Sequence, residues 1–314
     1  MTLPDMPALY KFSSEELVKV IARRQPHSDT SSDDVLDFIN KGCFAMIREM
    51  GYDLDTIKVD FLRKNGIPLW GSGRIPLLVK TGDQEFVLKP YDVHNPEEER
   101  RVLGHLQRKQ ADIAPEVYWI GDKGYAEEFF NTGKSLTDIA EEESVESAIR
   151  TGGEMHARLA LLGVNYNHNH WVDEFYVGDG RKIVDFGTAQ LYFLRGSSAK
   201  FDTQLKKMEK GVESVMQSDH MDRRYWADGP FFGIPFRFRM DLGTPVIEQA
   251  LSAGKTPEER LNMLIGWYSV GVGIFQHFLT SDHPFDSEAA MKATIQNMPA
   301  FLGSFSTTYA SHPT

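Results

Sequence analysis

An aspartate near the middle of the chain is followed by a glycine turn in a pattern that suits metal and phosphate chemistry. Asp185 follows the short apolar run Ile183-Val184 and precedes Phe186-Gly187. A strand that delivers a carboxylate onto such a turn can hold a divalent cation against the phosphates of a nucleotide. The tripeptide also occurs by chance, so its interpretation depends on the residues that precede it.

A lysine and an acidic helix precede this aspartate. Lys89 ends the apolar stretch Phe86–Leu88, which is typical of a strand, and a charged helix is predicted over Pro96–Gln110. A lysine at this position can meet phosphates if it points inward, and Glu99 on the helix is the best acidic partner, with the two glutamates before it as alternatives. Taken alone, a surface lysine on an edge strand explains the pattern better.

Two further segments are candidates for nucleotide contacts. Gly71 and Gly73 lie in a short glycine-rich run that could cover phosphates, although Pro76 stands where the full pattern has a third glycine. A plain hairpin turn explains this run equally well. The segment from Glu127 to Leu136 is typical of a hinge, where backbone groups would bind adenine, and an ordinary strand-to-helix loop is the simpler explanation.

In their order and spacing, these parts resemble the protein kinase-like fold. The resemblance is to its small, divergent members, the RIO-like, KEOPS-complex-kinase-like and aminoglycoside or choline-kinase-like groups, and it covers roughly residues 65–190. It implies an α+β fold with two lobes, a small antiparallel-sheet N-lobe and a helical C-lobe, with a cleft between them. It also implies that ATP and Mg²⁺ bind, with Lys89 on the phosphates, Glu99 holding Lys89, and Asp185 with Glu174 on the metal. The motifs that carry it are Val87-Leu88-Lys89, Glu99 with Leu103, Glu128–Leu136, Met155–Leu159 and Ile183–Gly187.

The chain departs from this family in the catalytic loop. Counting back from Asp185 places the loop at residues 167–177, where Asn169 takes the position of the catalytic aspartate and Glu174 that of a metal-binding asparagine. An amide does not accept a proton usefully, and loss of a general base typically costs about 10²–10⁴-fold in rate. Glu174 still offers oxygen ligands that suit Mg²⁺. An engineered exchange at Asn169 would not explain Glu174.

Other residues of this loop could replace the missing base. Asp173 could take one role if the backbone turns differently, and His168 and His170 are further proton acceptors. For the two histidines, packing or hydrogen bonding within the loop is the simpler explanation. We therefore keep Asn169, Asp173 and Lys89 as the candidate catalytic residues.

The pattern along the chain predicts three regions. These are a helical extension over 1–60, a kinase-like N-lobe over 61–132 and a C-lobe over 133–314 with additional C-terminal helices. The N-lobe contains a predicted hairpin around Thr81-Gly82-Asp83, and Leu261–Leu279 is predicted to be a buried helix. Later in the C-lobe an aromatic-rich stretch, Tyr225–Phe238, favours core packing over a partner-binding groove.

Composition limits the function classes. The formal net charge of −11 over 314 residues argues against broad nucleic-acid binding. The one cysteine excludes an intramolecular disulfide and fits a reducing compartment, and the N-terminus shows no secretory signal, so we expect a cytoplasmic protein without a membrane segment.

Three functions are compatible with these residues. The first is an active ATP-dependent transferase with a non-standard base, which acts on a protein or a small molecule or transfers a nucleotidyl group. The second is a regulatory pseudokinase that binds nucleotide and a protein partner. The third, an unrelated α+β protein, is the weakest. The pattern favours nucleotide binding with altered or reduced catalysis, because the binding residues are present while the base position holds Asn169.

Overall fold

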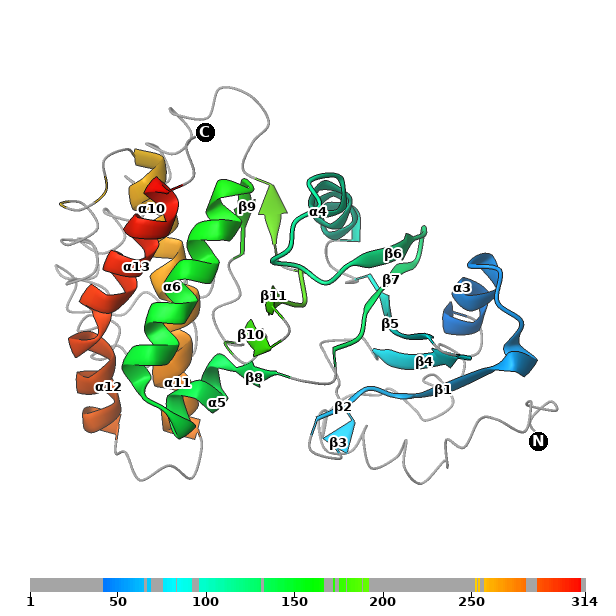
Figure 1. The fold of residues 1–314 in the computed structure, drawn as a ribbon, viewed down its shortest axis with the longest axis horizontal. Helices are drawn as coiled ribbons and strands as arrows, with labels where there is room; N and C mark the ends of the chain where they lie inside the picture. Colours follow the sequence, from blue (N-terminus) through cyan, green and yellow to red (C-terminus); the bar gives the residue numbers. More distant parts are fainter. Residues whose placement is uncertain are drawn as a thin grey trace, which may run out of the picture. The chain divides into compact units, whose positions relative to one another are not determined.

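The computed structural model defines two compact units, each described here by itself (Figure 1). Unit 1 takes its described residues from 1–107 and 115–131, and unit 2 takes them from 108–114 and 132–314. The residues described are 42–64, 67–68, 76–82, 84–91, 96–130, 133–166, 172, 175–178, 180–187, 189–191, 252, 254, 257–280 and 287–311. The sequence prediction for residues 1–41 and the aromatic-rich stretch Tyr225–Phe238 lie outside these residues.

Unit 1 is built on a five-stranded antiparallel sheet with the order β1-β4-β5-β7-β6. Strands β4 and β5 form the predicted hairpin, with Thr81 opposite Gln84 and Leu77 opposite Leu88. The charged helix α4 follows β5, as the sequence predicted. The elements of unit 1 are α3 (Phe44–Glu49), a 3₁₀ turn (Leu54–Thr56), β1 (Ile57–Phe61), β2 (Arg63–Lys64), β3 (Ile67–Pro68), β4 (Leu77–Thr81), β5 (Gln84–Pro90), α4 (Pro96–Arg108), β6 (Val117–Ile120) and β7 (Gly124–Glu128).

The core of unit 1 forms between α3 and one face of this sheet. Alternate residues of a strand point to opposite faces, and the burial of β1 follows that period. Phe86 and Leu88 of β5 and Ala126 of β7 therefore share a face, and they join a buried cluster with residues of α3. Lys89 and its neighbours on the opposite face of β5 are left for other contacts.

Cys43, the one cysteine of the chain, lies in this core. Its side chain is fully buried, and burial raises the pKa of the thiol to about 12. Because the thiolate is the reactive form, we expect no labelling of the folded protein by a thiol reagent at pH 8 and one labelled thiol per chain in denaturant. Fast labelling of the folded protein would contradict this burial.

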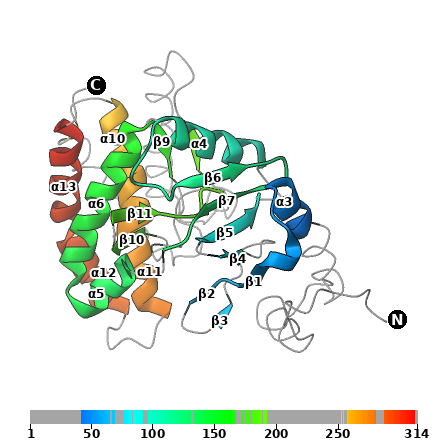
Figure 2. The same ribbon diagram turned by 45° about the vertical axis from the view of Figure 1, so that its right-hand side comes forward.

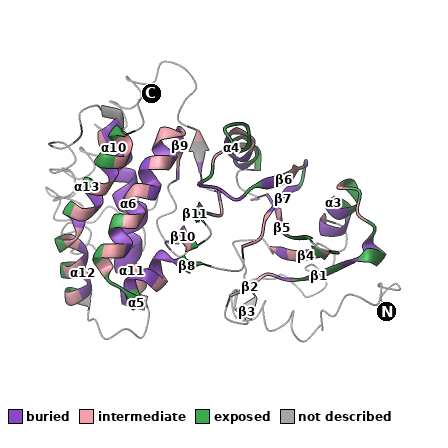
Figure 3. Cartoon of the chain, in the orientation of Figure 1, coloured by how far each residue is buried: buried purple, intermediate pink, exposed green. Residues whose placement is uncertain are grey.

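Unit 2 is mainly helical, and its long helix α6 packs against α13, α5 and α10 (Figures 1 and 2). Figure 3 shows that buried positions run along α6 and α11. The predicted helix over Leu261–Leu279 is buried but is interrupted by a π-helical turn. Its helices are α5 (Leu136–Glu142), α6 (Val145–Leu161), α10 (Pro257–Trp267), the π turn (Tyr268–Val272), α11 (Gly273–Thr280), α12 (Ser287–Gln296) and α13 (Met298–Ala310).

Short strands accompany the helices of unit 2. A three-stranded antiparallel sheet has the order β11-β10-β8, and it presents the segment that leads to Asp185. Together the two units confirm the predicted α+β class. Within the described residues, none of the helices is both long and apolar enough to span a membrane. The strands are β8 (Lys134–Ser135), β9 (Val164–Asn165), β10 (Phe175–Gly178), β11 (Gly180–Ile183) and β12 (Gln190–Leu191).

Candidate functional site

In unit 1, Lys89 forms a buried ion pair with Glu127. The two antiparallel strands place Lys89 opposite Tyr125 and Val87 opposite Glu127, so the lysine and the glutamate are diagonal neighbours on one face. The Lys89 Nζ and Glu127 Oε1 atoms are 2.5 Å apart, and the side chains are 12% and 2% exposed. A charge pair this far from water persists only with close geometry, so the ammonium is held at one place on the sheet.

Glu99 belongs to the same face of unit 1. It is fully buried on α4, and its Oε1 accepts a hydrogen bond of 3.1 Å from the hydroxyl of Tyr125, which is itself fully buried. The two glutamates before it lie at the surface or partly so, and Glu98 pairs with Arg101 at 2.7 Å. Of the three acidic residues that open α4, the one singled out by the sequence is therefore the one that turns inward.

A glycine lets the two strands approach where Lys89 sits. A Cβ atom on Gly124 would lie 2.3 Å from the carbonyl oxygen of Lys89 and 2.7 Å from the sulfur of Met46. Neither contact is sterically allowed, so only glycine fits opposite Pro90 in this register. The end of β5 that carries the lysine is thus packed tightly on β7.

Glu128 lies at the end of β7 and points to the other face from Glu127. Its backbone N–H donates to the carbonyl of Glu116 at 2.8 Å, and its Oε2 accepts from the N–H of Glu116 at 3.2 Å. These contacts fix the end of the strand before the predicted hinge. Its predicted contact with a nucleotide stays a prediction.

In unit 2, Asp185 adopts a backbone conformation that few residues other than glycine accept. Its φ angle is +59°, and its Oδ1 accepts a hydrogen bond of 3.3 Å from the N–H of Gly187. Aspartate tolerates this left-handed region because its short side chain bonds the backbone locally. Such conformations concentrate at functional sites, where the surrounding structure imposes them.

The residues around Asp185 are fixed by Tyr166. The hydroxyl of Tyr166 donates to the carbonyl of Val184 at 2.8 Å, and its ring packs edge-on against Phe186 and Phe175. Tyr166 is also the residue directly before the predicted catalytic loop. One buried aromatic side chain therefore fixes the aspartate turn within unit 2.

The backbone of Tyr166 is anchored from behind by His156 of α6. His156 Nε2 lies 3.3 Å from the Tyr166 carbonyl oxygen, which also accepts a bond of 2.9 Å from Ser269. Since a carbonyl only accepts, Nε2 carries the proton of the neutral ring. Burial lowers the pKa of His156 to about 4. A Cβ on Gly266 would lie 2.9 Å from Nδ1, so α10 closes over this edge of the ring.

The burial of His156 predicts a loss of stability in acid. The histidine pKa falls from 6.5 in the unfolded chain to about 4 in the folded protein, so the unfolded chain binds the proton more tightly. The contribution of neutral His156 to the free energy of unfolding is fully present above about pH 6.5. It is lost as the pH falls toward 4, which lowers the stability by about 3 kcal/mol. Chemical denaturation at several pH values measures the free energy of unfolding, which should fall with pH over this range in the wild type and in the control His105→Gln. If His156→Gln showed the same pH dependence of the free energy of unfolding, that dependence would belong to other groups.

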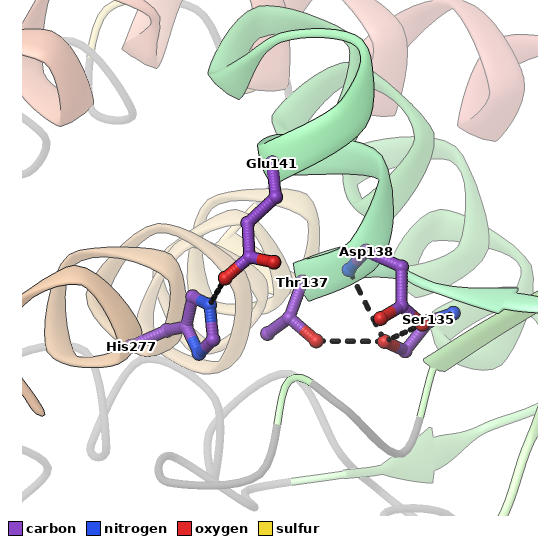
Figure 4. Close-up of polar contacts among 5 residues, drawn as sticks. All are labelled: Ser135, Thr137, Asp138, Glu141 and His277. Atoms are coloured by element: carbon purple, nitrogen blue, oxygen red, sulfur yellow. Dashed lines mark hydrogen bonds and ion pairs between the residues drawn. The ribbon is translucent and has the colours of Figure 1, made fainter. Parts of the chain in front are cut away.

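The start of α5 is joined to the sheet whose strand β11 leads to Asp185 (Figure 4). Ser135 and Asp138 form a capping box, in which Asp138 Oδ2 accepts from the Ser135 N–H at 2.7 Å and the Asp138 N–H donates to Ser135 Oγ at 3.3 Å. Ser135 also pairs with Tyr176 of β10, the neighbour of β11. Figure 4 also shows a contact between α5 and α11, in which His277 Nε2 of α11 lies 2.7 Å from Glu141 Oε1 of α5.

Several candidates from the sequence lie outside the described residues. They are the two glycines of the glycine-rich run and the residues of the predicted catalytic loop. Their roles stay predictions: Gly71, Gly73, His168, Asn169, His170, Asp173 and Glu174.

Sequence reasoning missed the ion-pair partner of Lys89. Glu127 was assigned to the hinge segment and not to the face of the lysine. The alternation of Tyr125 and Glu127 along the strand would have placed both on one face, but the register with β5 was needed to choose that face. The anchoring role of His156 had no local signal, because it depends on contacts with α10 and with Tyr166.

Comparison with known proteins gives structural matches only. No protein-family model and no curated protein matches the sequence. An ethanolamine kinase from Plasmodium vivax is 15% identical, covers 96% of this chain and 91% of its own, and has a TM-score of 0.35. A choline kinase from Cryptosporidium parvum Iowa II is 10% identical, covers 87% and 97%, and has a TM-score of 0.32.

A protein from Ralstonia eutropha JMP134, assigned as an aminoglycoside phosphotransferase, also matches. It is 15% identical, covers 86% of this chain and 98% of its own, and has a TM-score of 0.31. The three are named as two kinases and a phosphotransferase, and their identities to this chain are low. At such identities and scores the likeness carries no argument about activity, so the function is argued from the residues of this chain.

Proposed function

We propose that this chain binds ATP with Mg²⁺ and is a kinase-type protein of altered or reduced catalytic competence. The observation that supports this most strongly is the buried cluster on unit 1, where Lys89 is held by Glu127 and Glu99 is held by Tyr125. A lysine on the third strand of the sheet and a glutamate on the helix that follows are the residues with which kinases position ATP phosphates.

The second part of the proposal concerns the metal. Magnesium usually keeps several waters and binds one or two carboxylates together with substrate phosphates. Among the described residues, no group of three or more acidic, histidine or cysteine side chains could hold a metal by itself. Asp185, placed on a rigid turn, fits the first carboxylate of such a site, and Glu174 is the proposed second. Bound Mg²⁺ would neutralise charge on the phosphates.

Catalysis in this proposal is limited by the loop. The position of the general base holds Asn169, so transfer would depend on positioning and charge neutralisation, or on Asp173 as a substitute base. The protein is then either an atypical phosphotransferase or a regulatory pseudokinase that acts on a protein partner. A fully active protein or small-molecule kinase with a non-standard base is the alternative, and a reducing, cytoplasmic location remains our expectation.

Labelled nucleotides separate these functions. Wild-type protein and Asp185→Ala are incubated with γ-labelled or α-labelled ATP, with Mg²⁺ or Mn²⁺, and label on protein or added acceptors is measured. Metal-dependent transfer that disappears in Asp185→Ala supports the transferase, and the label that moves identifies the group transferred. Thermal stabilisation by MgATP without transfer supports the pseudokinase. Absence of both would contradict the proposed function.

A further inference from the structure

Lys89 of β5 forms an ion pair with Glu127 of the neighbouring strand β7. We infer that Glu127 is a positioning residue that holds the ammonium of Lys89 for the phosphates of the nucleotide. This inference rests on the proposed function and adds a residue that the kinase resemblance does not supply. Its basis is the ion pair of 2.5 Å between a lysine that is 12% exposed and a glutamate that is 2% exposed.

The register explains why Glu127 can hold the lysine firmly. Lys89 lies opposite Tyr125 and Glu127 lies opposite Val87, so the two charges are diagonal neighbours on adjacent hydrogen-bonded strands. Both side chains start from strands of one sheet, so little movement of one backbone relative to the other is available. Both charged groups are therefore carried by regular structure, which positions side chains more precisely than a loop does.

Tyr125 connects the carboxylate of Glu99 to this face of the sheet. Its fully buried side chain is opposite Lys89 in the register, and its hydroxyl donates to Glu99 Oε1 at 3.1 Å. The hydroxyl therefore attaches α4 to the same face of the sheet, while Glu127 holds the ammonium.

The expected ligand group is phosphate. An ammonium has three N–H donors, so the ion pair with Glu127 is compatible with further hydrogen bonds to phosphate oxygens. Without Glu127 the ammonium would lose a carboxylate that holds it at this place on the sheet, and a charge removed from water depends on such close partners. Loss of Glu127 should therefore weaken contacts with phosphates and leave contacts with the base unchanged.

The test compares MgATP with adenosine, each titrated calorimetrically into wild type, Glu127→Gln, Glu127→Asp and the control Glu85→Gln. Glu85 lies on the same strand as Lys89 and forms an exposed ion pair with Lys80. We expect Glu127→Gln to lose about 10-fold or more in MgATP affinity, with adenosine affinity kept within about twofold. Glu127→Asp should show a smaller loss, and the control none.

The outcomes separate the inference from the function on which it rests. No MgATP binding by the wild type would overturn the proposed function and this inference with it. Wild-type binding with unchanged or tighter MgATP affinity in Glu127→Gln would overturn the inference alone. Equal losses for MgATP and adenosine would assign Glu127 a structural role and also overturn it. If Glu127→Gln does not fold, the same comparison is made with Glu127→Asp: a loss of MgATP affinity without a loss of adenosine affinity supports the inference, and unchanged or equal affinities overturn it.

Discussion

Replacing Lys89 with methionine is expected to abolish the thermal stabilisation that MgATP gives the wild-type protein. Ligand at 100 times its dissociation constant adds about 2.7 kcal/mol to stability, which corresponds to about 5 °C in melting temperature for a protein of this size. Methionine has a similar length but no charge for the phosphates. Differential scanning fluorimetry with and without MgATP measures the effect.

The same variant should also be less stable without ligand. Glu127 is 2% exposed, and removing its cationic partner leaves a buried carboxylate, at a cost of about 3–5 kcal/mol. The double variant Lys89→Met with Glu127→Gln should recover part of this stability but no response to MgATP. Lys80→Met is the matched control, because its ion pair with Glu85 is exposed and contributes about 0–1 kcal/mol. A full response of Lys89→Met to MgATP would remove the lysine from the site.

Replacing Asp185 with asparagine is expected to remove the dependence of nucleotide binding on Mg²⁺. Asparagine accepts the left-handed backbone at φ +59° and keeps an oxygen for the Gly187 N–H, so only the charge is lost. We expect ATP affinity in Mg²⁺ to fall by about 10-fold or more, to the value that wild type shows in EDTA. Titrations in the two buffers measure it.

Two further variants control this experiment. Asp112→Asn removes an exposed carboxylate of unit 2 that pairs with Arg158, and it should bind MgATP as the wild type does. Asp185→Ala should add backbone strain of about 1–2 kcal/mol to the loss of metal, because alanine is disfavoured in the left-handed region. If Asp185→Asn kept the full effect of Mg²⁺, the metal would bind elsewhere.

Much of the fold was predictable because local patterns agree with it. The apolar alternation and the glycine turn at Gly82 predicted the hairpin of β4 and β5, and the charged run from Pro96 predicted α4. The two-residue strands β8, β9 and β12 were not predictable. They exist only through pairing with distant segments, such as Ser135 with Tyr176, and two residues carry no periodic signal.

The candidate site was predictable in its residue types more than in its contacts. The sequence indicated Lys89, Glu99 and Asp185, and the structure shows the first two in one buried cluster of unit 1. It did not indicate Glu127 as the partner of Lys89, because a diagonal contact depends on the register of two strands that are separated by α4. The rigid turn at Asp185 likewise depends on Tyr166, whose hydroxyl reaches Val184 from a different segment.

The most direct test of the central claim is a calorimetric titration of the wild-type protein with three ligands: MgATP, ATP in EDTA, and adenosine. If Lys89 binds phosphate and Asp185 binds the metal, we expect saturable binding of MgATP, weaker binding without Mg²⁺ and the weakest binding for adenosine. No binding of MgATP, or equal affinities for MgATP and adenosine, would contradict the account.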